Sequence, residues 1–151
     1  MTNNANNYLS AAAEGATPIG LVVLLYDRLV SDLARATAAM EQGDVERRVA
    51  EINHALLILG QLEGSLDSTQ APEAARTQAL FYQVARSRIL EAHVKSSRQM
   101  LQEQIALFSD VRAAWEQVDR ARYSTLPATP RLPRASQNQD GDDPTPLDAT
   151  A

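Results

Sequence analysis

The residues of this chain that could do chemistry are few, and its two histidines come first. Glu51 and His54 have the Glu-x-x-His spacing that supplies ligands to di-iron sites in helical bundles. Such a site needs a second pair, but the other histidine, His93, has its nearest acid, Glu91, only two residues before it. Positions two apart on a helix point to different faces. We therefore expect no metal site, and we interpret Glu51 and His54 as solvated side chains.

Other kinds of catalytic site also lack their residues. The chain has no Cys, which excludes disulfides, thiolate metal sites and cysteine nucleophiles. It contains no glycine-rich phosphate loop and no serine nucleophile elbow. The neighbours of His54 and His93 do not match those of a phosphotransfer histidine. The sequence predicts a protein that is not an enzyme and that needs no cofactor.

The composition favours helices and limits the kinds of partner. Of 151 residues, 44% are hydrophobic but only 5% aromatic, and Ala, Leu, Gln, Glu and Arg suit helices that pack with small and aliphatic side chains. The net charge of −5 includes no basic cluster, so nucleic acid is excluded as a partner. No stretch resembles a signal peptide or reaches the ~20 apolar residues of a membrane span. We expect a cytoplasmic protein without membrane insertion.

Capping residues divide the chain into four expected helices. Thr17-Pro18 is a typical start and Gly43 a typical stop, so the first helix should cover about 18–41. Asp44 should cap a second helix that runs to about residue 66. Pro72 should begin the third.

A short break at about 95–97 should separate the third helix from the fourth. Ser96 and Gln99 have the spacing of a capping box there. The fourth helix should end near residue 120.

Apolar residues recur at helical spacing in each segment. The expected core positions are Val22, Tyr26, Leu29, Leu33, Ala36 and Met40; Val45, Val49, Ile52, Leu56, Leu59, Leu62 and Leu66; Ala75, Ala79, Tyr82, Ala85, Ile89 and Ala92; and Leu101, Ile105, Phe108, Val111, Trp115 and Val118. The third set is unusually small, which implies either a close approach to a neighbour or a groove. The predicted fold is all-α, an antiparallel up-down-up-down four-helix bundle over residues 17–123. A flexible N-terminal arm (1–16) precedes it, and a disordered Pro-rich C-terminal tail (124–151) follows.

Two segments contain more large apolar residues than one buried stripe needs. Between Ile19 and Leu25 every residue except Gly20 is large and apolar, and Ala55 to Leu59 forms a second such run. The surplus is either enclosed between neighbouring helices or lines an exposed groove for a partner helix.

A series of short motifs runs along about residues 8–120. They are Tyr8, Thr17-Pro18, Leu25-Tyr26-Asp27, Gly43-Asp44, Ala55, Ile58, Leu62, Ser65-Leu66-Asp67, Phe81-Tyr82, Leu90-Glu91-Ala92 and Val111-Arg112-Ala113-Ala114-Trp115. In their order and spacing these motifs resemble the FliS family of flagellin-specific export chaperones. The chain departs from the family's usual residue types at Leu56, Leu57, Gln61, Gln78 and Val84. These departures affect how closely the groove implied by the resemblance matches that of the family.

The resemblance implies a cytoplasmic chaperone that binds the disordered C-terminal segment of flagellin, prevents its premature polymerisation and keeps it competent for export. Further partners in the export apparatus or among flagellar regulators are open. The alternative function is a helical-bundle regulator that sequesters another flagellar or secretion component.

For the partner-binding surface we select five apolar residues and one polar orienter, Asp27. The apolar ones are Ile19, Val22, Val23, Tyr26 and Leu57. For Tyr26 a core position facing Trp115 or Tyr82 remains open, and Trp115 itself fits the core better than a site. In the family the N-terminal arm can occupy part of the groove, and Tyr8 and Leu9 are the residues expected to act here as such a self-cap.

Overall fold

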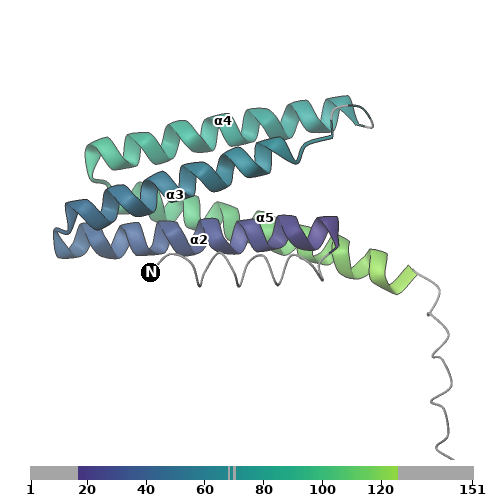
Figure 1. Ribbon diagram of the computed structural model, residues 1–151, viewed down its shortest axis with the longest axis horizontal. Helices are drawn as coiled ribbons and strands as arrows, with labels where there is room; N and C mark the ends of the chain where they lie inside the picture. Colours follow the sequence, from purple (N-terminus) through teal and green to yellow (C-terminus); the bar gives the residue numbers. More distant parts are fainter. Residues whose placement is uncertain (1–16, 68, 70, 126–151) are drawn as a thin grey trace, which may run out of the picture.

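Four α-helices make up the part of the chain that the computed structural model describes, residues 17–67, 69 and 71–125 (Figure 1). They are α2 (Pro18–Gln42), α3 (Val45–Gly64), α4 (Pro72–Lys95) and α5 (Arg98–Thr125). Successive helices run in opposite directions, and α2 lies between α3 and α5 and packs closely against both. α4 completes the ring against α3 and α5 through fewer contacts. The predicted four-helix bundle is confirmed, while the predicted arm (1–16) and nearly all of the predicted tail lie outside the described residues.

The caps at both ends of α2 are those that the sequence predicts. The Thr17 hydroxyl accepts a hydrogen bond from the Gly20 amide at 2.9 Å, and Pro18 takes the first helical position. Gly43 ends the helix with a left-handed backbone, φ 70°, which glycine adopts without strain. Asp44 then caps α3 by accepting from the Arg47 amide at 3.1 Å.

The break between α4 and α5 lies where predicted, but the predicted capping box of Ser96 and Gln99 is wrong. Ser96 instead ends α4 with a left-handed backbone, φ 50°. Ser97 caps the next helix, because its hydroxyl accepts from the Met100 amide at 3.2 Å. The Gln99 side chain points along α5 and donates to Glu103 at 3.4 Å.

Two predicted helix ends are also shifted. α3 ends at Gly64, before the predicted residue 66, and α5 runs to Thr125 instead of ending near 120. The residues from 121 to 125 include neither Gly nor Pro, and the next helix breaker is Pro127. Because a proline disfavours the helical conformation of the residue before it, the helix continues almost to that point.

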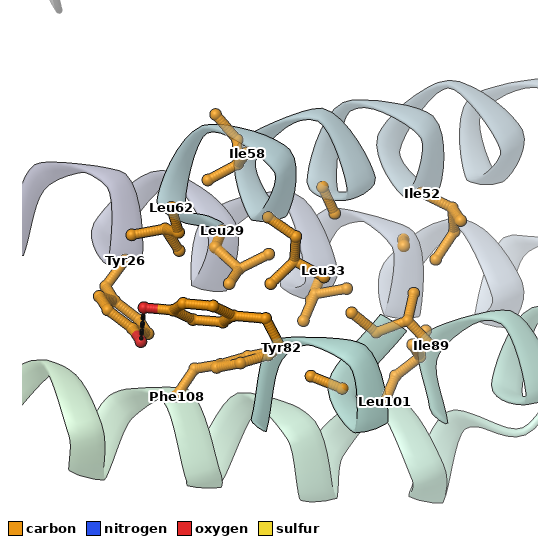
Figure 2. Packing of buried hydrophobic residues seen from close by; sticks show 14 of the residues in the cluster. Tyr26, Leu29, Leu33, Ile52, Ile58, Leu62, Tyr82, Ile89, Leu101 and Phe108 are labelled. Atoms are coloured by element: carbon orange, nitrogen blue, oxygen red, sulfur yellow. Dashed lines mark hydrogen bonds between the residues drawn. The ribbon is translucent and has the colours of Figure 1, made fainter. Parts of the chain in front are cut away.

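The core is a cluster of aliphatic side chains with an aromatic group at one end (Figure 2). Tyr26 of α2 and Tyr82 of α4 are 1% and 2% exposed, and their hydroxyl groups form a hydrogen bond of 2.9 Å. The Tyr26 ring also lies against Phe108 of α5, with centroids 6.1 Å apart, and Phe81 packs against both Tyr82 and Phe108. Tyr26 therefore occupies the core position facing Tyr82. Three residues expected in the core are exposed: Val45 and Val49 near the start of α3, and Val118 on α5.

Burial raises the pKa of both phenols above the ordinary value of a tyrosine, since ionisation would place a charge in the core. The hydrogen bond to Tyr82 raises the pKa of Tyr26 further. A hydrogen bond from Trp115 to Tyr26 opposes this rise. Both hydroxyls are therefore neutral, and Tyr82 depends on Tyr26 for its hydrogen-bond partner inside the bundle.

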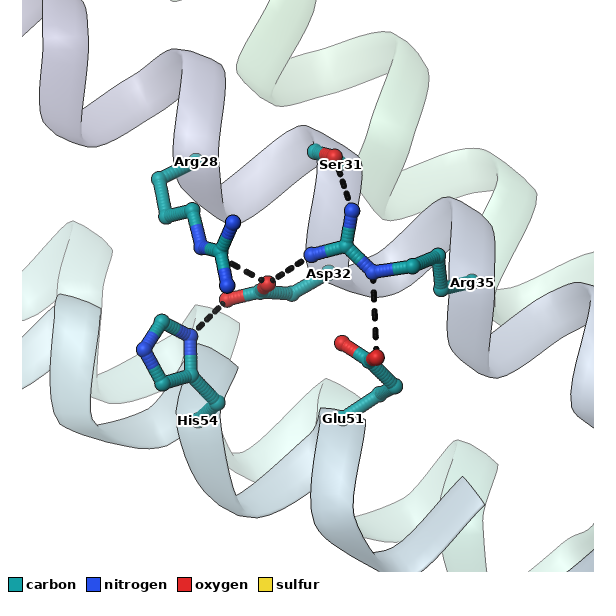
Figure 3. Close-up of polar contacts among 6 residues, drawn as sticks. All are labelled: Arg28, Ser31, Asp32, Arg35, Glu51 and His54. Carbon is teal, nitrogen blue, oxygen red and sulfur yellow. Dashed lines mark hydrogen bonds and ion pairs between the residues drawn. The ribbon is translucent and has the colours of Figure 1, made fainter. Parts of the chain in front are cut away.

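A buried carboxylate, Asp32, joins α2 to α3 through an ion-pair network (Figure 3). Its side chain is fully buried and lies 2.6 Å from Arg35, 3.2 Å from Arg28 and 2.5 Å from Nδ1 of His54. Arg35 also donates to Glu51 at 3.0 Å. The interpretation of Glu51 and His54 as solvated side chains is therefore wrong, because Asp32 and Arg35 lie opposite them on α2.

The hydrogen bond between the two phenols predicts that the stability losses from substituting Tyr26 and Tyr82 are not additive. Tyr26→Phe alone should cost about 1–3 kcal/mol of unfolding free energy, because it leaves the buried Tyr82 hydroxyl without its partner. Tyr26→Phe combined with Tyr82→Phe should cost less than the sum of the two single changes. Urea unfolding of all four proteins measures the cycle. Strictly additive losses would contradict a mutual dependence of the two hydroxyls.

The burial of Asp32 predicts how its contribution to stability varies with pH. Burial raises the pKa of Asp32, against the opposing effects of His54, Arg28 and Arg35. The folded protein then holds this proton more tightly than the unfolded chain. The stability contributed by the carboxyl is fully present below the ordinary aspartate pKa of about 4 and is lost as pH rises through the raised pKa.

The test compares Asp32→Asn with the unsubstituted protein by urea unfolding at pH 7 and pH 4. The stability advantage of the unsubstituted protein should increase towards pH 4. Asp27→Asn is the matched control, since Asp27 lies on the same helix but in an exposed pair with Arg112, worth less than about 1 kcal/mol. An advantage that shrinks as the pH falls would contradict the assignment.

Candidate partner-binding surface

A pocket of about 260 Å³ lies at the end of the bundle where α2 begins and α3 passes into α4. Its walls are mainly apolar, with Val22 of α2, Leu66 after α3, and Trp115 of α5. Tyr82 contributes an aromatic wall, and Asp67, Ser65 and Gln78 add polar groups. Small residues at the start of α4, Ala74 and Ala75, leave the space open. The groove that the small residues of this helix suggested is thus present at its N-terminal end.

A second apolar feature is the outer face of α4, formed by Leu80, Val84, Leu90 and Val94. These side chains are 61%, 52%, 43% and 82% exposed. Leu80, Val84 and Val94 lie within about 40° of one direction around the helix, opposite the buried Tyr82. α4 therefore carries large apolar side chains on two sides, although Glu91, paired with Arg88 and Lys95, lies among those of the outer side. Apolar patches of this kind mark interaction sites when they are contiguous.

The sequence interpretation missed this outer α4 face. It followed only the small residues of the inward stripe and applied the search for surplus apolar residues to the first two helices. The same search extended to residues 80–94 finds all four side chains, because each lies off the core stripe.

The structure distributes the predicted site residues over different surroundings. Leu57 is 66% exposed on α3, and Val22 lines the pocket. Ile19 is half-buried in the first turn of α2. Val23 and Tyr26 are buried, so neither presents its side chain at the surface of the folded bundle. Tyr8 and Leu9 lie outside the described residues.

Asp27 has an intramolecular partner. It forms an ion pair with Arg112, which joins α2 to α5, and Arg112 also donates to Glu116 at 2.9 Å. The hydrogen bond to Asp27 raises the pKa of Arg112 above its already high ordinary value, so the guanidinium group stays charged throughout the physiological range. A partner that uses Asp27 must therefore share it with Arg112.

The described residues offer apolar contact area and no centre for metal chemistry. Among residues 17–67, 69 and 71–125, no three His, Cys, Asp or Glu side chains are grouped to hold a metal ion. None of the four helices is both long and apolar enough to cross a membrane.

Comparison with known proteins identifies the family. The family model described as "Flagellar protein FliS" matches residues 1–122. The flagellar secretion chaperone FliS of Salmonella typhimurium is 30% identical over 111 residues, which are 73% of this chain and 82% of that protein. The flagellar secretion chaperone FliSB of Pseudomonas aeruginosa is 30% identical over 108 residues, 72% of this chain and 86% of that protein. The flagellar secretion chaperone FliS of Bacillus subtilis is 27% identical over 110 residues, which are 73% of this chain and 81% of that protein.

These matches confirm the resemblance carried by the sequence motifs, over the same helices. They also confirm that the chain is not an enzyme, because the family's members are named as chaperones. A match to the family model over most of the sequence, on a four-helix bundle, shows that this chain belongs to the FliS family.

Proposed function

We propose that this chain is a cytoplasmic export chaperone that binds the disordered C-terminal segment of flagellin, prevents its premature polymerisation and keeps it competent for export. The observation that carries the proposal is the exposed outer α4 face, together with Leu57 of the neighbouring α3. The relatives are named as flagellar secretion chaperones, which supports a cargo from the flagellum.

The exposed side chains are sufficient in number for a partner that folds as it binds. Ordering a disordered segment costs about 2–5 kcal/mol or more. Each Leu or Val side chain that becomes fully buried returns roughly 1.5–3 kcal/mol. The outer α4 face alone supplies four such side chains, so an amphipathic helix laid along α4 recovers more than its ordering cost.

Calorimetric titration of the protein with the C-terminal segment of flagellin from the same organism tests the proposal. We expect one-to-one binding with a negative heat-capacity change, the mark of apolar burial. Absence of heat, with no complex in gel filtration, would overturn it and favour a regulator that sequesters another flagellar or secretion component.

Polar substitutions on α4 locate the surface. Leu80→Ser combined with Val84→Ser should weaken flagellin binding by at least about tenfold, a loss of about 1.4 kcal/mol, while folding is little changed because both side chains are exposed. The matched control is Leu107→Ser with Val118→Ser, which removes two exposed apolar side chains of α5. Equal weakening by both double substitutions would show that the outer α4 face is not the contact surface.

The N-terminal arm is proposed to act as a self-cap through Tyr8 and Leu9, which competes with flagellin for part of the binding surface. Deletion of residues 2–16 should then tighten flagellin binding in the same titration, since the client no longer competes with a tethered segment. Unchanged or weaker affinity would contradict the self-cap.

A further inference from the structure

The sequence that follows α5 repeats proline every third residue, at Pro127, Pro130 and Pro133. Polyproline II helices have three residues per turn, so this spacing sets the three rings along one edge of such a helix. The only basic residues of the tail, Arg131 and Arg134, have the same spacing and share a neighbouring edge. The family match ends at residue 122, so this segment, residues 127–134, is an addition to the family's common part.

The pocket at the end of the bundle has the chemistry that such a segment requires. Proline-rich segments dock in grooves lined by aromatic rings, and Trp115 and Tyr82 line this pocket. At about 260 Å³ it is smaller than the 300–1,000 Å³ typical of small-molecule sites, and its size suits one or two side chains of a polypeptide. Asp67 also lines the pocket, and its Oδ1 accepts hydrogen bonds from the Thr69 amide at 3.0 Å and hydroxyl at 2.6 Å, so a basic side chain would share this carboxylate with Thr69.

The distances along the chain also agree. Thr125, the last residue of α5, lies ten residues beyond Trp115, which is roughly 15 Å of helix. A chain that turns back in the polyproline II conformation covers about 3.1 Å per residue and regains this distance in about five residues. Pro130 is five residues beyond Thr125. A chain turned back at Pro127 would therefore bring Pro130 to the level of Trp115, with Pro133 about 9 Å further along.

We propose that residues 127–134 fold back on α5 and dock their prolines against Trp115 in this pocket, with Arg131 directed towards Asp67. The docking itself does not depend on the identity of the client. Its consequence for binding rests on the proposed function: a client that uses the pocket must first displace the tail. A tether provides an effective concentration in the millimolar range, so a segment with a dissociation constant of about 0.1 mM fills the pocket about nine-tenths of the time. It then weakens the client's apparent affinity about tenfold.

Trp115 is the only tryptophan in the chain, so its fluorescence reports directly on the pocket. In the full-length protein, Pro127→Ala, Pro130→Ala and Pro133→Ala together should shift the Trp115 emission to longer wavelength and increase its quenching by acrylamide. The matched control, Pro144→Ala with Pro146→Ala, removes two prolines of the same tail that do not have the three-residue spacing, and should change neither. Circular dichroism verifies that the bundle is intact in both variants.

Two outcomes would overturn the proposal. Unchanged fluorescence in the triple variant means that the prolines do not contact Trp115. A fluorescence change on deletion of residues 2–16, without one in the triple variant, assigns the pocket to the N-terminal arm instead. Because the fluorescence requires no client, a positive result together with an absence of flagellin binding supports the docked tail and rejects only the proposed function.

Discussion

The hydrogen bond between the Tyr26 and Tyr82 hydroxyls is the contact on which the arrangement of α4 depends. Most inward residues of α4 are alanines, which bring little apolar area to the core, and Tyr82 and Ile89 are the large exceptions. Burying a hydroxyl without a partner is costly, so each phenol fixes the position of the other and thereby the register of α4 against α2. The small residues that surround this anchor leave α4 less closely packed than the other helices and leave the pocket beside Tyr82 open.

The fold could be predicted almost completely from local signals. Thr17, Gly43 and Asp44 act through their immediate neighbours, so the sequence is sufficient to place the helix ends that they set. The sequence does not decide whether Ser96 or Ser97 caps α5, because both residues fit a capping pattern. The choice depends on which of the two adopts the left-handed backbone that ends α4. The predicted end of α5 near residue 120 is too early. No Gly or Pro lies between that residue and Pro127, so nothing in the sequence ends the helix there.

The site was less predictable, because it depends on which helix faces which. Leu57 could be recognised from the sequence of its own helix as an apolar residue beyond those that the buried stripe needs. Tyr26 was not assignable until Tyr82, 56 positions away, could be placed opposite it. The ionic surroundings of His54 required the pairing of α2 with α3, because its partner Asp32 lies 22 positions earlier in the sequence. Long-range pairing of this kind leaves no trace in the spacing of residues along one helix.

The Thr17 hydroxyl donates to Asp119 at 2.7 Å, so the first residue of the described bundle touches its last turns. The chain consequently enters and leaves the bundle at one point, next to the pocket. Segments attached before Thr17 and after α5 therefore leave from the same region of the bundle. Two separate routes of evolutionary change can thus alter one binding site while the helices that build it stay the same.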